Sequence, residues 1–175
     1  MRLCAPAKLT VSLRITGVRP DGYHELDAEM VTLSLADELF VDEGGTELTV
    51  EGEAWTRADA IERSADNLVA RALAACGRRA AVRLVKRIPL GAGLGGGSAD
   101  AAAILRWAGA TDPGLAAGLG ADVPFCITGG RARVRGVGDH VSPLGFERRD
   151  YLLALPPFGV DTAAVSTPKG GRARR

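Results

Sequence analysis

The sequence from Ile88 to Leu105 reads IPLGAGLGGGSADAAAIL and combines a glycine-rich segment with an alanine-rich one. Its glycines end at Ser98, and an alanine-rich run that favours a helix follows at once. The first amides of a helix have no partner within it, and the helix dipole adds about half a positive charge at that end. Glycines before such a helix let phosphate oxygens approach the backbone. The stretch therefore predicts a loop suited to a polyphosphate, with Ser98 as the N-cap of a helix over 98–108.

Two other phosphate loops fit this stretch less well. A P-loop requires a lysine before its serine or threonine, whereas Gly97 directly precedes Ser98. The dinucleotide-binding pattern G-x-G-x-x-G does occur over 91–96, but it belongs to a βαβ unit with an acidic residue about 20 residues further on. Asp112 lies at that distance, in a segment that is typical of a turn. A glycine loop that merely permits close packing is the simplest alternative.

The apolar pattern along the chain predicts an α+β fold, with a mixed sheet covered by helices. Alternating apolar and polar residues predict strands over 9–15, 28–43 (one or two strands, broken near Asp37), 46–53, 80–88 and 151–156, and a hairpin over 131–144. Helical patterns cover 67–76, with Ser64 and Asp66 as candidate N-caps, 98–108, and a short segment within 115–125 that leads into a turn. Strands come first in pairs and helices follow, which favours α+β over alternating α/β.

Composition and charge narrow the class of protein. The net charge of +1 gives no indication of nucleic acid or a membrane surface as a partner. The three cysteines have no metal-ligand or disulfide spacing, which favours a reducing cytoplasm. No apolar run is long enough to span a bilayer, and the N-terminus lacks a signal-peptide core. The closing STPKGGRARR is polar and basic and predicts a disordered tail.

Several segments resemble, in order, the superfamily named for galactokinase, homoserine kinase, mevalonate kinase and phosphomevalonate kinase. The combination is similar to one family within it, the 4-diphosphocytidyl-2-C-methyl-D-erythritol kinases, and comprises APAKLTVSLRI from Ala5, RPDGYHEL from Arg19, DNLVARA from Asp66, KRIP from Lys86, LGADVPF from Leu119 and GVGD from Gly136. The resemblance extends to about Thr162. It implies a ribosomal protein S5 domain 2-like fold, with 1–155 as the ATP-binding domain and 156–175 as the lead into a second domain plus the tail.

The resemblance also implies a reaction and its two catalytic residues. The family transfers the γ-phosphate of ATP, with Mg²⁺, to the 2-hydroxyl of its cytidyl diphosphate sugar-alcohol in the non-mevalonate isoprenoid pathway. Asp122 in LGADVPF matches the aspartate that accepts or orients the hydroxyl proton. Lys8 in APAK matches the lysine that keeps this carboxylate ionised and neutralises the phosphoryl group. From the residues alone, Asp122 is typical of a turn cap and Lys8 of an exposed strand start.

The same resemblance implies the binding residues. Tyr23 and His24 match the cytidine pocket, although a turn with a ring at the core edge would also explain them. Asn67 and Lys86 match the adenine side, and the alternatives are a helix-start residue and a solvated strand end. Thr10 stands where the family has asparagine, and the contact with the substrate is expected there. The residues expected to hold the phosphates of ATP are Pro89, Gly91, Gly93, Gly95, Gly96, Gly97 and Ser98.

The chain departs from the family in three further places. The connection over 108–119 is short, and Ser166 replaces an aromatic residue that stacks on cytosine in some members. The sequence ends where members continue into a second domain, so we expect a truncated chain, as a monomer or a homodimer. Two rival hypotheses stay open: a nucleotide-binding fragment without turnover, and an NAD-dependent oxidoreductase, which requires a parallel sheet with Gly91 just after its first strand.

Overall fold

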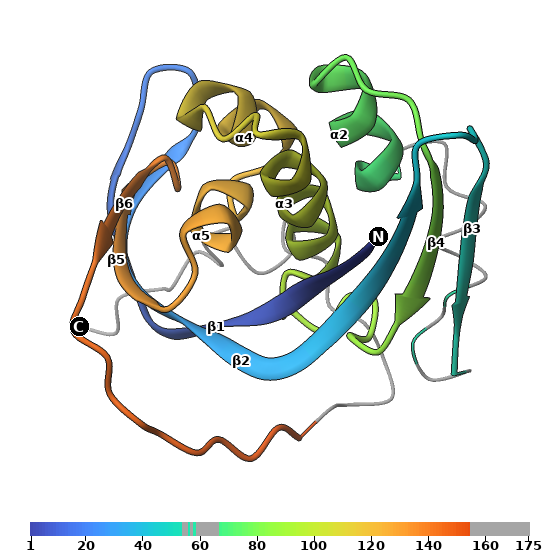
Figure 1. Ribbon diagram of the computed structural model, residues 1–175. Helices are drawn as coiled ribbons and strands as arrows, with labels where there is room; N and C mark the ends of the chain where they lie inside the picture. Colours follow the sequence, from blue (N-terminus) through green and yellow to red (C-terminus); the bar gives the residue numbers. More distant parts are fainter. Residues whose placement is uncertain (54–55, 57, 59–66, 155–175) are drawn as a thin grey trace, which may run out of the picture.

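The computed structural model describes residues 1–53, 56, 58 and 67–154. Within them a curved sheet of mixed direction wraps around a group of helices (Figure 1). This arrangement confirms the predicted α+β class and does not have the parallel sheet that an NAD-dependent oxidoreductase requires. Ser64, Asp66, Ser166 and the predicted tail lie outside the described residues.

The long strand β2 (His24–Asp42) organises the sheet. On one edge it pairs antiparallel with β1 (Arg2–Val18) along nearly its whole length. On the other edge, the two ends of β2 pair with different partners, and both pairings are antiparallel. These partners are β5 (Arg131–Gly136) and β4 (Ala81–Lys86). The outer strands are β3 (Leu48–Gly52), parallel to β4, and β6 (His140–Pro143), antiparallel to β5.

The helices of the described residues lie on the concave side of the sheet (Figure 1). They are α2 (Leu68–Ala75), α3 (Gly96–Ala108), α4 (Pro113–Leu119) and α5 (Val123–Thr128). Helix α3 is central, and every residue from 99 to 105 is buried. Its alanines carry little side-chain bulk, so β1, α2 and α5 can all pack closely against it. The glycine loop therefore leads into a helix that is held in place by its packing.

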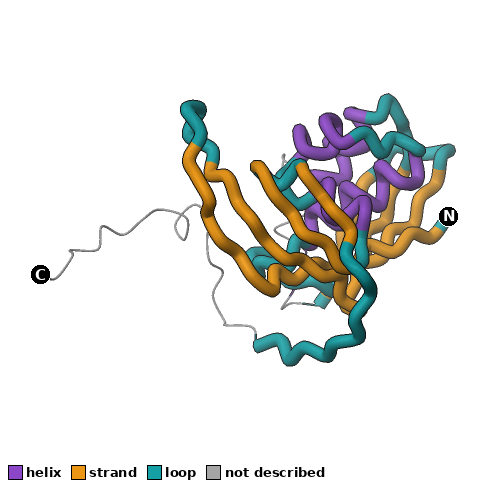
Figure 2. Tube along the Cα trace, turned by 90° about the vertical axis from the view of Figure 1, so that its left-hand side faces the viewer, coloured by secondary structure: helices purple, strands orange, loops and turns teal. Residues whose placement is uncertain are grey.

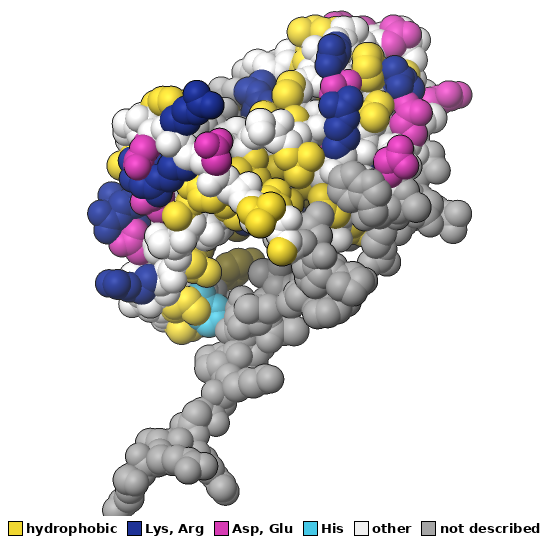
Figure 3. Space-filling view, turned by 90° about the horizontal axis from the view of Figure 1, so that it is seen from below, with side chains coloured by type: hydrophobic (Ala, Val, Ile, Leu, Met, Phe, Trp, Pro, Cys, Tyr) yellow, Lys and Arg dark blue, Asp and Glu magenta, His cyan; other side chains and the backbone are white. Residues whose placement is uncertain are grey.

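Two views show what the helices leave uncovered. The strands extend beyond the helices on one side (Figure 2), where Leu13, Ile15 and Val18 are more than half exposed. From below, hydrophobic side chains gather in the middle of the face, with charged side chains on either side (Figure 3). A second, smaller apolar cluster of Ala7, Ile88 and Leu94 packs where β1 meets the glycine loop.

The structure corrects three of the predicted elements. Residues 24–42 form one unbroken strand, because the buried Asp37 finds hydrogen-bond donors in Lys86 and the residues after it. Residues 151–154 form no strand, and Leu152 is almost fully exposed. The short helix expected within 115–125 is confirmed as α4, and a turn follows it, but a second helix, α5, begins directly after this turn and was not predicted. The hairpin over 131–144 is confirmed.

Candidate active site

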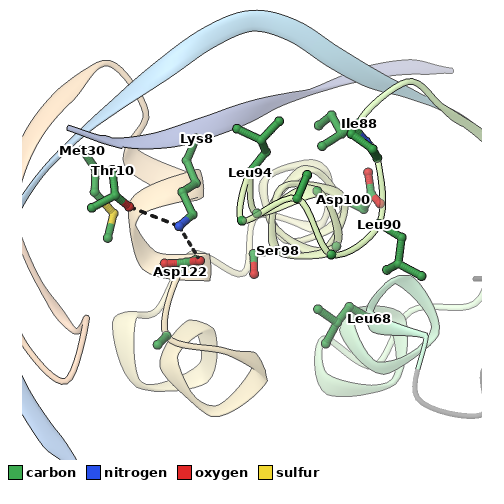
Figure 4. Close-up of a pocket in the computed structure, with 18 of the residues that line it drawn as sticks. Lys8, Thr10, Met30, Leu68, Ile88, Leu90, Leu94, Ser98, Asp100 and Asp122 are labelled. Carbon is green, nitrogen blue, oxygen red and sulfur yellow. Dashed lines mark hydrogen bonds and ion pairs between the residues drawn. The ribbon is translucent and has the colours of Figure 1, made fainter. Parts of the chain in front are cut away.

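A cleft of about 710 Å³ opens between β1, the glycine loop, and the starts of α2, α3 and α5 (Figure 4). It brings together most of the residues that the sequence predicts for the site. Those that line it are Lys8, Thr10, Asn67, Lys86, Pro89, Gly91, Gly93, Gly95, Gly96, Gly97, Ser98 and Asp122. Tyr23 and His24 do not line it, because they lie at the far end of the β1–β2 hairpin.

The glycine loop passes from β4 to α3 through alternating backbone conformations. Gly91, Gly93 and Gly95 have φ angles of 75°, 73° and 66°, in the left-handed region that other residues avoid. Gly95 precedes the first helical residue, Gly96, so α3 begins two residues before Ser98. The prediction that Ser98 is the N-cap is therefore wrong, and no side chain caps this helix. The side chain of Ser98 lies instead beside the turn that precedes α5, at the end of the cleft near Asp122 (Figure 4).

Lys8 and the glycine loop lie in direct contact. The amide of Lys8 donates to the carbonyl of Leu94 at 2.9 Å, which joins β1 to the loop. A Cβ atom on Gly95 would come within 2.7 Å of Cγ of Lys8, closer than two carbon atoms can pack. Gly95 is thus required both for its backbone conformation and for the passage of the lysine side chain. This close packing aims the Lys8 side chain past the loop and into the cleft.

Lys8 and Asp122 form an ion pair at the wall of the cleft. Nζ of Lys8 lies 3.2 Å from Oδ2 of Asp122, and it also donates to Oγ1 of Thr10 at 3.2 Å (Figure 4). The side chains of Lys8 and Asp122 are 11% and 30% exposed, so the pair is partly dehydrated yet accessible from the cleft. Asp122 stands at the N-cap position of α5, but its side chain makes no capping hydrogen bond. The alternative for Lys8 is wrong, because Lys8 is not an exposed surface lysine.

Lys86 lies in a second and fully buried group beside the cleft. Its ammonium donates to Asp37 and, at 2.7 Å, to Oδ2 of Asp100. Burial opposes the charged form of Lys86, but the two carboxylates outweigh it and raise the pKa of the lysine. Burial, with Asp37 nearby, raises the pKa of Asp100 to about 7 although Lys86 acts in the opposite direction. The alternative of a solvated strand end is therefore wrong.

Asp37 and Asp100 were absent from the predicted site residues. A signal for them was present, because Asp100 is a lone carboxylate in an alanine-rich run and Asp37, next to Glu38, interrupts an otherwise largely apolar strand pattern. Such a residue can be buried only with a partner. The sequence did not reveal that partner, since Lys86 lies 49 residues after Asp37 and 14 before Asp100.

Comparisons with known proteins agree with this geometry. The model of the GHMP kinases N terminal domain matches residues 59–130. The chain is 42% identical over 165 residues to the 4-diphosphocytidyl-2-C-methyl-D-erythritol kinase of Paracoccus denitrificans, covering 94% of this chain and 59% of that protein. It is 41% identical over 180 residues to the kinase of that name from Neisseria meningitidis serogroup A, covering 95% of this chain and 63% of the relative.

The chain contains a GHMP kinase N-terminal domain. A crystal structure of a 4-(cytidine 5'-diphospho)-2C-methyl-D-erythritol kinase is 42% identical, with a TM-score of 0.63 over 82% of this chain and 55% of that one. The predicted resemblance is thus confirmed, and so is the fold as a GHMP kinase N-terminal domain. A heptose 1-phosphate kinase from Bacteriodes thetaiotaomicron, at 16% identity and a TM-score of 0.57, shares the fold. The chain spans about three fifths of the length of the curated relatives it matches.

Within this GHMP kinase domain, Asn67 has a clear local role. Its side chain caps α2 by accepting a hydrogen bond from the amide of Val69 at 2.9 Å. The helix-start alternative is therefore confirmed, and the residue also lines the cleft. The cap lies one residue later than Asp66, because the helix starts at Leu68. Contact of Asn67 with a nucleotide stays a prediction.

The cytidine residues lie apart from the phosphate loop. Tyr23 is 65% exposed just after the turn of the β1–β2 hairpin, where its amide donates to Asp21 at 3.2 Å, and His24 begins β2. Between this turn and Lys8 the cleft is lined by the apolar side chains of Leu13, Leu26 and Met30. The strands thus supply an apolar path from the turn to the ion pair. The role of Tyr23 and His24 stays a prediction.

The described part of the chain lacks two features. No group of three or more histidine, cysteine, aspartate or glutamate side chains is arranged there to hold a metal ion. None of the helices there combines the length and the apolar character needed to cross a membrane.

Proposed function

We propose that the chain carries the ATP site and the phosphoryl-transfer residues of a 4-diphosphocytidyl-2-C-methyl-D-erythritol kinase. The reaction would move the γ-phosphate of ATP to the 2-hydroxyl of the cytidyl substrate, in the non-mevalonate isoprenoid pathway. The observation that carries the proposal is the Lys8–Asp122 pair at 3.2 Å, in the same cleft as the first amides of α3. Phosphoryl transfer needs little beyond such positioning and charge stabilisation.

The glycine loop would hold the triphosphate of ATP. The first amides of α3 are not capped by any side chain, and the alternating glycines keep the approach to them clear. Unpaired amides and the positive end of the helix dipole together favour an anion at this point. Asn67 and Leu68, at the start of α2, border the same cleft. The nucleoside part of ATP would lie next to them, beside the glycine loop.

Asp122 and Lys8 divide the chemistry between them. The carboxylate of Asp122 would take the proton of the 2-hydroxyl while that oxygen forms its bond to the γ-phosphorus. The bond from the γ-phosphorus to the bridging oxygen breaks, and ADP leaves with the electron pair. The ammonium of Lys8 would stabilise the negative charge on the phosphoryl oxygens during transfer. A positioned base of this kind contributes about 10²–10⁴-fold to the rate.

The oxygen donors at this end of the cleft fit Mg²⁺. Mg²⁺ takes oxygen ligands and is usually held by one or two protein groups together with the phosphates of the substrate. Ser98 offers a hydroxyl at this end of the cleft (Figure 4). When bound with ATP, the ion would neutralise phosphate charge. Ser98 and the phosphates of ATP would hold it, which leaves the carboxylate of Asp122 free to take the proton.

The substrate would lie along β1 and β2. Its cytosine would stack on Tyr23 and hydrogen-bond to His24 at the hairpin turn, and its sugar-alcohol would extend past Met30 to Asp122. Thr10 would border the reacting hydroxyl, because its own hydroxyl already accepts a hydrogen bond from Lys8. The hairpin turn would thus bind the cytosine, and the end of the cleft at Asp122 would hold the reacting hydroxyl.

The test is transfer of labelled γ-phosphate from ATP to the cytidyl substrate by the full chain. Asp122→Asn should slow transfer by about 10²–10⁴-fold and leave ATP binding within about threefold in calorimetry. The matched control is Asp112→Asn, which changes an aspartate that caps α4 on the surface, and it should transfer normally. Equal rates for Asp122→Asn and the wild type would refute the proposal. ATP binding by the wild type without transfer would favour the non-catalytic fragment.

A further inference from the structure

The buried group of Asp37, Lys86 and Asp100, hereafter the triad, lies directly behind the phosphate loop. Lys86 is the last residue of β4, Asp100 lies in the second turn of α3, and Asp37 comes from the middle of β2. The three side chains are at most 3% exposed. The triad therefore joins the strand that enters the loop to the helix that leaves it.

Asp37 holds the entrance of the loop by its backbone. One carboxylate oxygen accepts the amides of Arg87 at 2.5 Å and Ile88 at 2.8 Å, and the other accepts from Lys86. Two consecutive amides on one oxygen leave the chain little freedom as it turns away from β4. The position of Pro89 and the first glycine of the loop follows from this anchor.

Lys86 connects this entrance to the exit of the loop. Its ammonium donates to Oδ2 of Asp100 at 2.7 Å, and a Cβ atom on Gly96 would lie 3.2 Å from the same nitrogen. The first residue of α3 therefore packs on the ammonium itself. One cation thus spans the nine residues between Lys86 and Gly96, and both ends of the loop are fixed to it.

The composition of the triad argues for a role beyond packing. Two carboxylates share a single ammonium, and Oδ1 of Asp100 is buried with no hydrogen-bond partner among the described residues. Apolar residues of similar volume would avoid this desolvation cost and commonly stabilise a protein as well or better. A buried charged group that costs desolvation energy is explained when it fixes a specific geometry. Here the triad fixes the conformation of the glycine loop.

We propose that Asp37, Lys86 and Asp100 are positioning residues, which hold the glycine loop and the first amides of α3 in the conformation that binds the triphosphate. Lys86 then acts on ATP through the loop instead of touching the nucleotide. The inference deepens the proposed function and rests on it for the identity of the anion. The order of the loop in the free protein can be tested without any ligand.

The first experiment is hydrogen exchange of the unliganded full chain, followed by mass spectrometry. In Lys86→Met and in the milder Asp37→Asn, the amides of residues 88–99 should exchange at least tenfold faster than in the wild type. Peptides from β5 and β6 should exchange at the wild-type rate. The matched control is Ile104→Val, which trims a fully buried side chain of α3 outside the triad. Its loop should exchange as in the wild type.

The second experiment is calorimetry with Mg–ATP and steady-state kinetics on the same variants. We expect ATP affinity and KM to worsen at least tenfold in Asp37→Asn, with kcat within about threefold of the wild type. If the Lys86→Met variant does not fold, the Asp37→Asn variant alone tests the positioning role. Unchanged loop exchange in Asp37→Asn, or equal loosening in Ile104→Val, overturns the inference. A wild type that does not bind ATP overturns the proposed function, and the exchange result then decides the loop role by itself.

Discussion

Two lysine–aspartate centres flank the glycine loop, and they differ in access to water. Lys8 and Asp122 meet at the wall of the cleft, where the aspartate is 30% exposed. Lys86 meets Asp37 and Asp100 behind the loop, where no member exceeds 3%. Both centres combine an ammonium with a carboxylate beside the glycine loop. Access to the cleft, more than residue type, therefore separates a centre suited to chemistry from one suited to holding a shape.

The same difference sets what each centre contributes to stability. A partly solvated ion pair contributes about 0–1 kcal/mol, because water and side-chain entropy offset the attraction. Removing one member of a buried pair costs about 3–5 kcal/mol, since the remaining charge has no compensation. Identical substitutions at the two lysines should therefore separate the centres.

The largest expected effect is on stability, from a lysine-to-methionine change at each centre. Lys86→Met should lower the free energy of unfolding by about 3–5 kcal/mol, because it leaves two buried carboxylates without their cation. Lys8→Met should lower it by about 1 kcal/mol or less. Urea unfolding followed by circular dichroism measures both values. Equal losses at the two positions would remove the distinction between an open and a sealed centre.

A second prediction concerns the pH dependence of the sealed centre. Because burial raises the pKa of Asp100 to about 7 in the folded chain, the folded state keeps a proton that the unfolded state releases near pH 4. Stability from this group is then complete below about pH 4 and falls as the pH rises to about 7. Asp100→Asn should remove that decline, which is on the order of a few kcal/mol.

Urea unfolding at several pH values between 4 and 8 measures the Asp100 effect. The difference between Asp100→Asn and the wild type should move in favour of the variant as the pH rises. Glu51→Gln alters an exposed ion pair with Arg83 and serves as the control, with a difference that stays nearly constant. Parallel curves for Asp100→Asn and the wild type would show that Asp100 is ionised in the fold throughout.

A smaller effect is expected where the open centre touches the loop. Gly95→Ala should lower the free energy of unfolding by about 1–2 kcal/mol, because alanine is strained in the left-handed backbone conformation of this position. The substitution should also displace Lys8, whose Cγ would lie 2.7 Å from the new Cβ. Gly109 at the end of α3 has a similar φ of 70° with nothing near its Cβ position. Gly109→Ala is therefore a control for strain alone. Only Gly95→Ala should slow phosphate transfer, and equal slowing in both variants would contradict the contact.

Much of this arrangement could be predicted from short segments. The glycine loop, the helix after it and the strand before it are local patterns, and the Lys8 and Asp122 positions followed from resemblance to a family. Predictions from local sequence patterns failed where contacts between distant segments determine the structure. Asp37 was expected to break a strand, because a carboxylate in an apolar run has no visible partner until β4 brings Lys86 to it. Ser98 was expected to cap α3, but Gly95 already supplies the turn into the helix.

The partners of the triad are distant in the chain, which explains why no motif revealed them. Lys86 in KRIP was matched to the adenine side of the nucleotide by resemblance to the family, and this contact stays a prediction. Lys86 lines the cleft, and its ammonium is held by Asp37 and Asp100. Thr10, which stands where the family has asparagine, accepts a hydrogen bond from Lys8. This contact depends on the geometry of β1, which the sequence spacing of the two residues does not reveal.

The most direct test of the account compares the steady-state kinetics of Lys8→Met and Lys86→Met with ATP and the cytidyl substrate. We predict that Lys8→Met lowers kcat by at least about 100-fold with KM for ATP within about threefold of the wild type. Lys86→Met should raise KM for ATP at least tenfold and spare kcat. A Lys8→Met chain that keeps its kcat, or a Lys86→Met chain that loses kcat at an unchanged KM, would contradict the division of roles between the two centres.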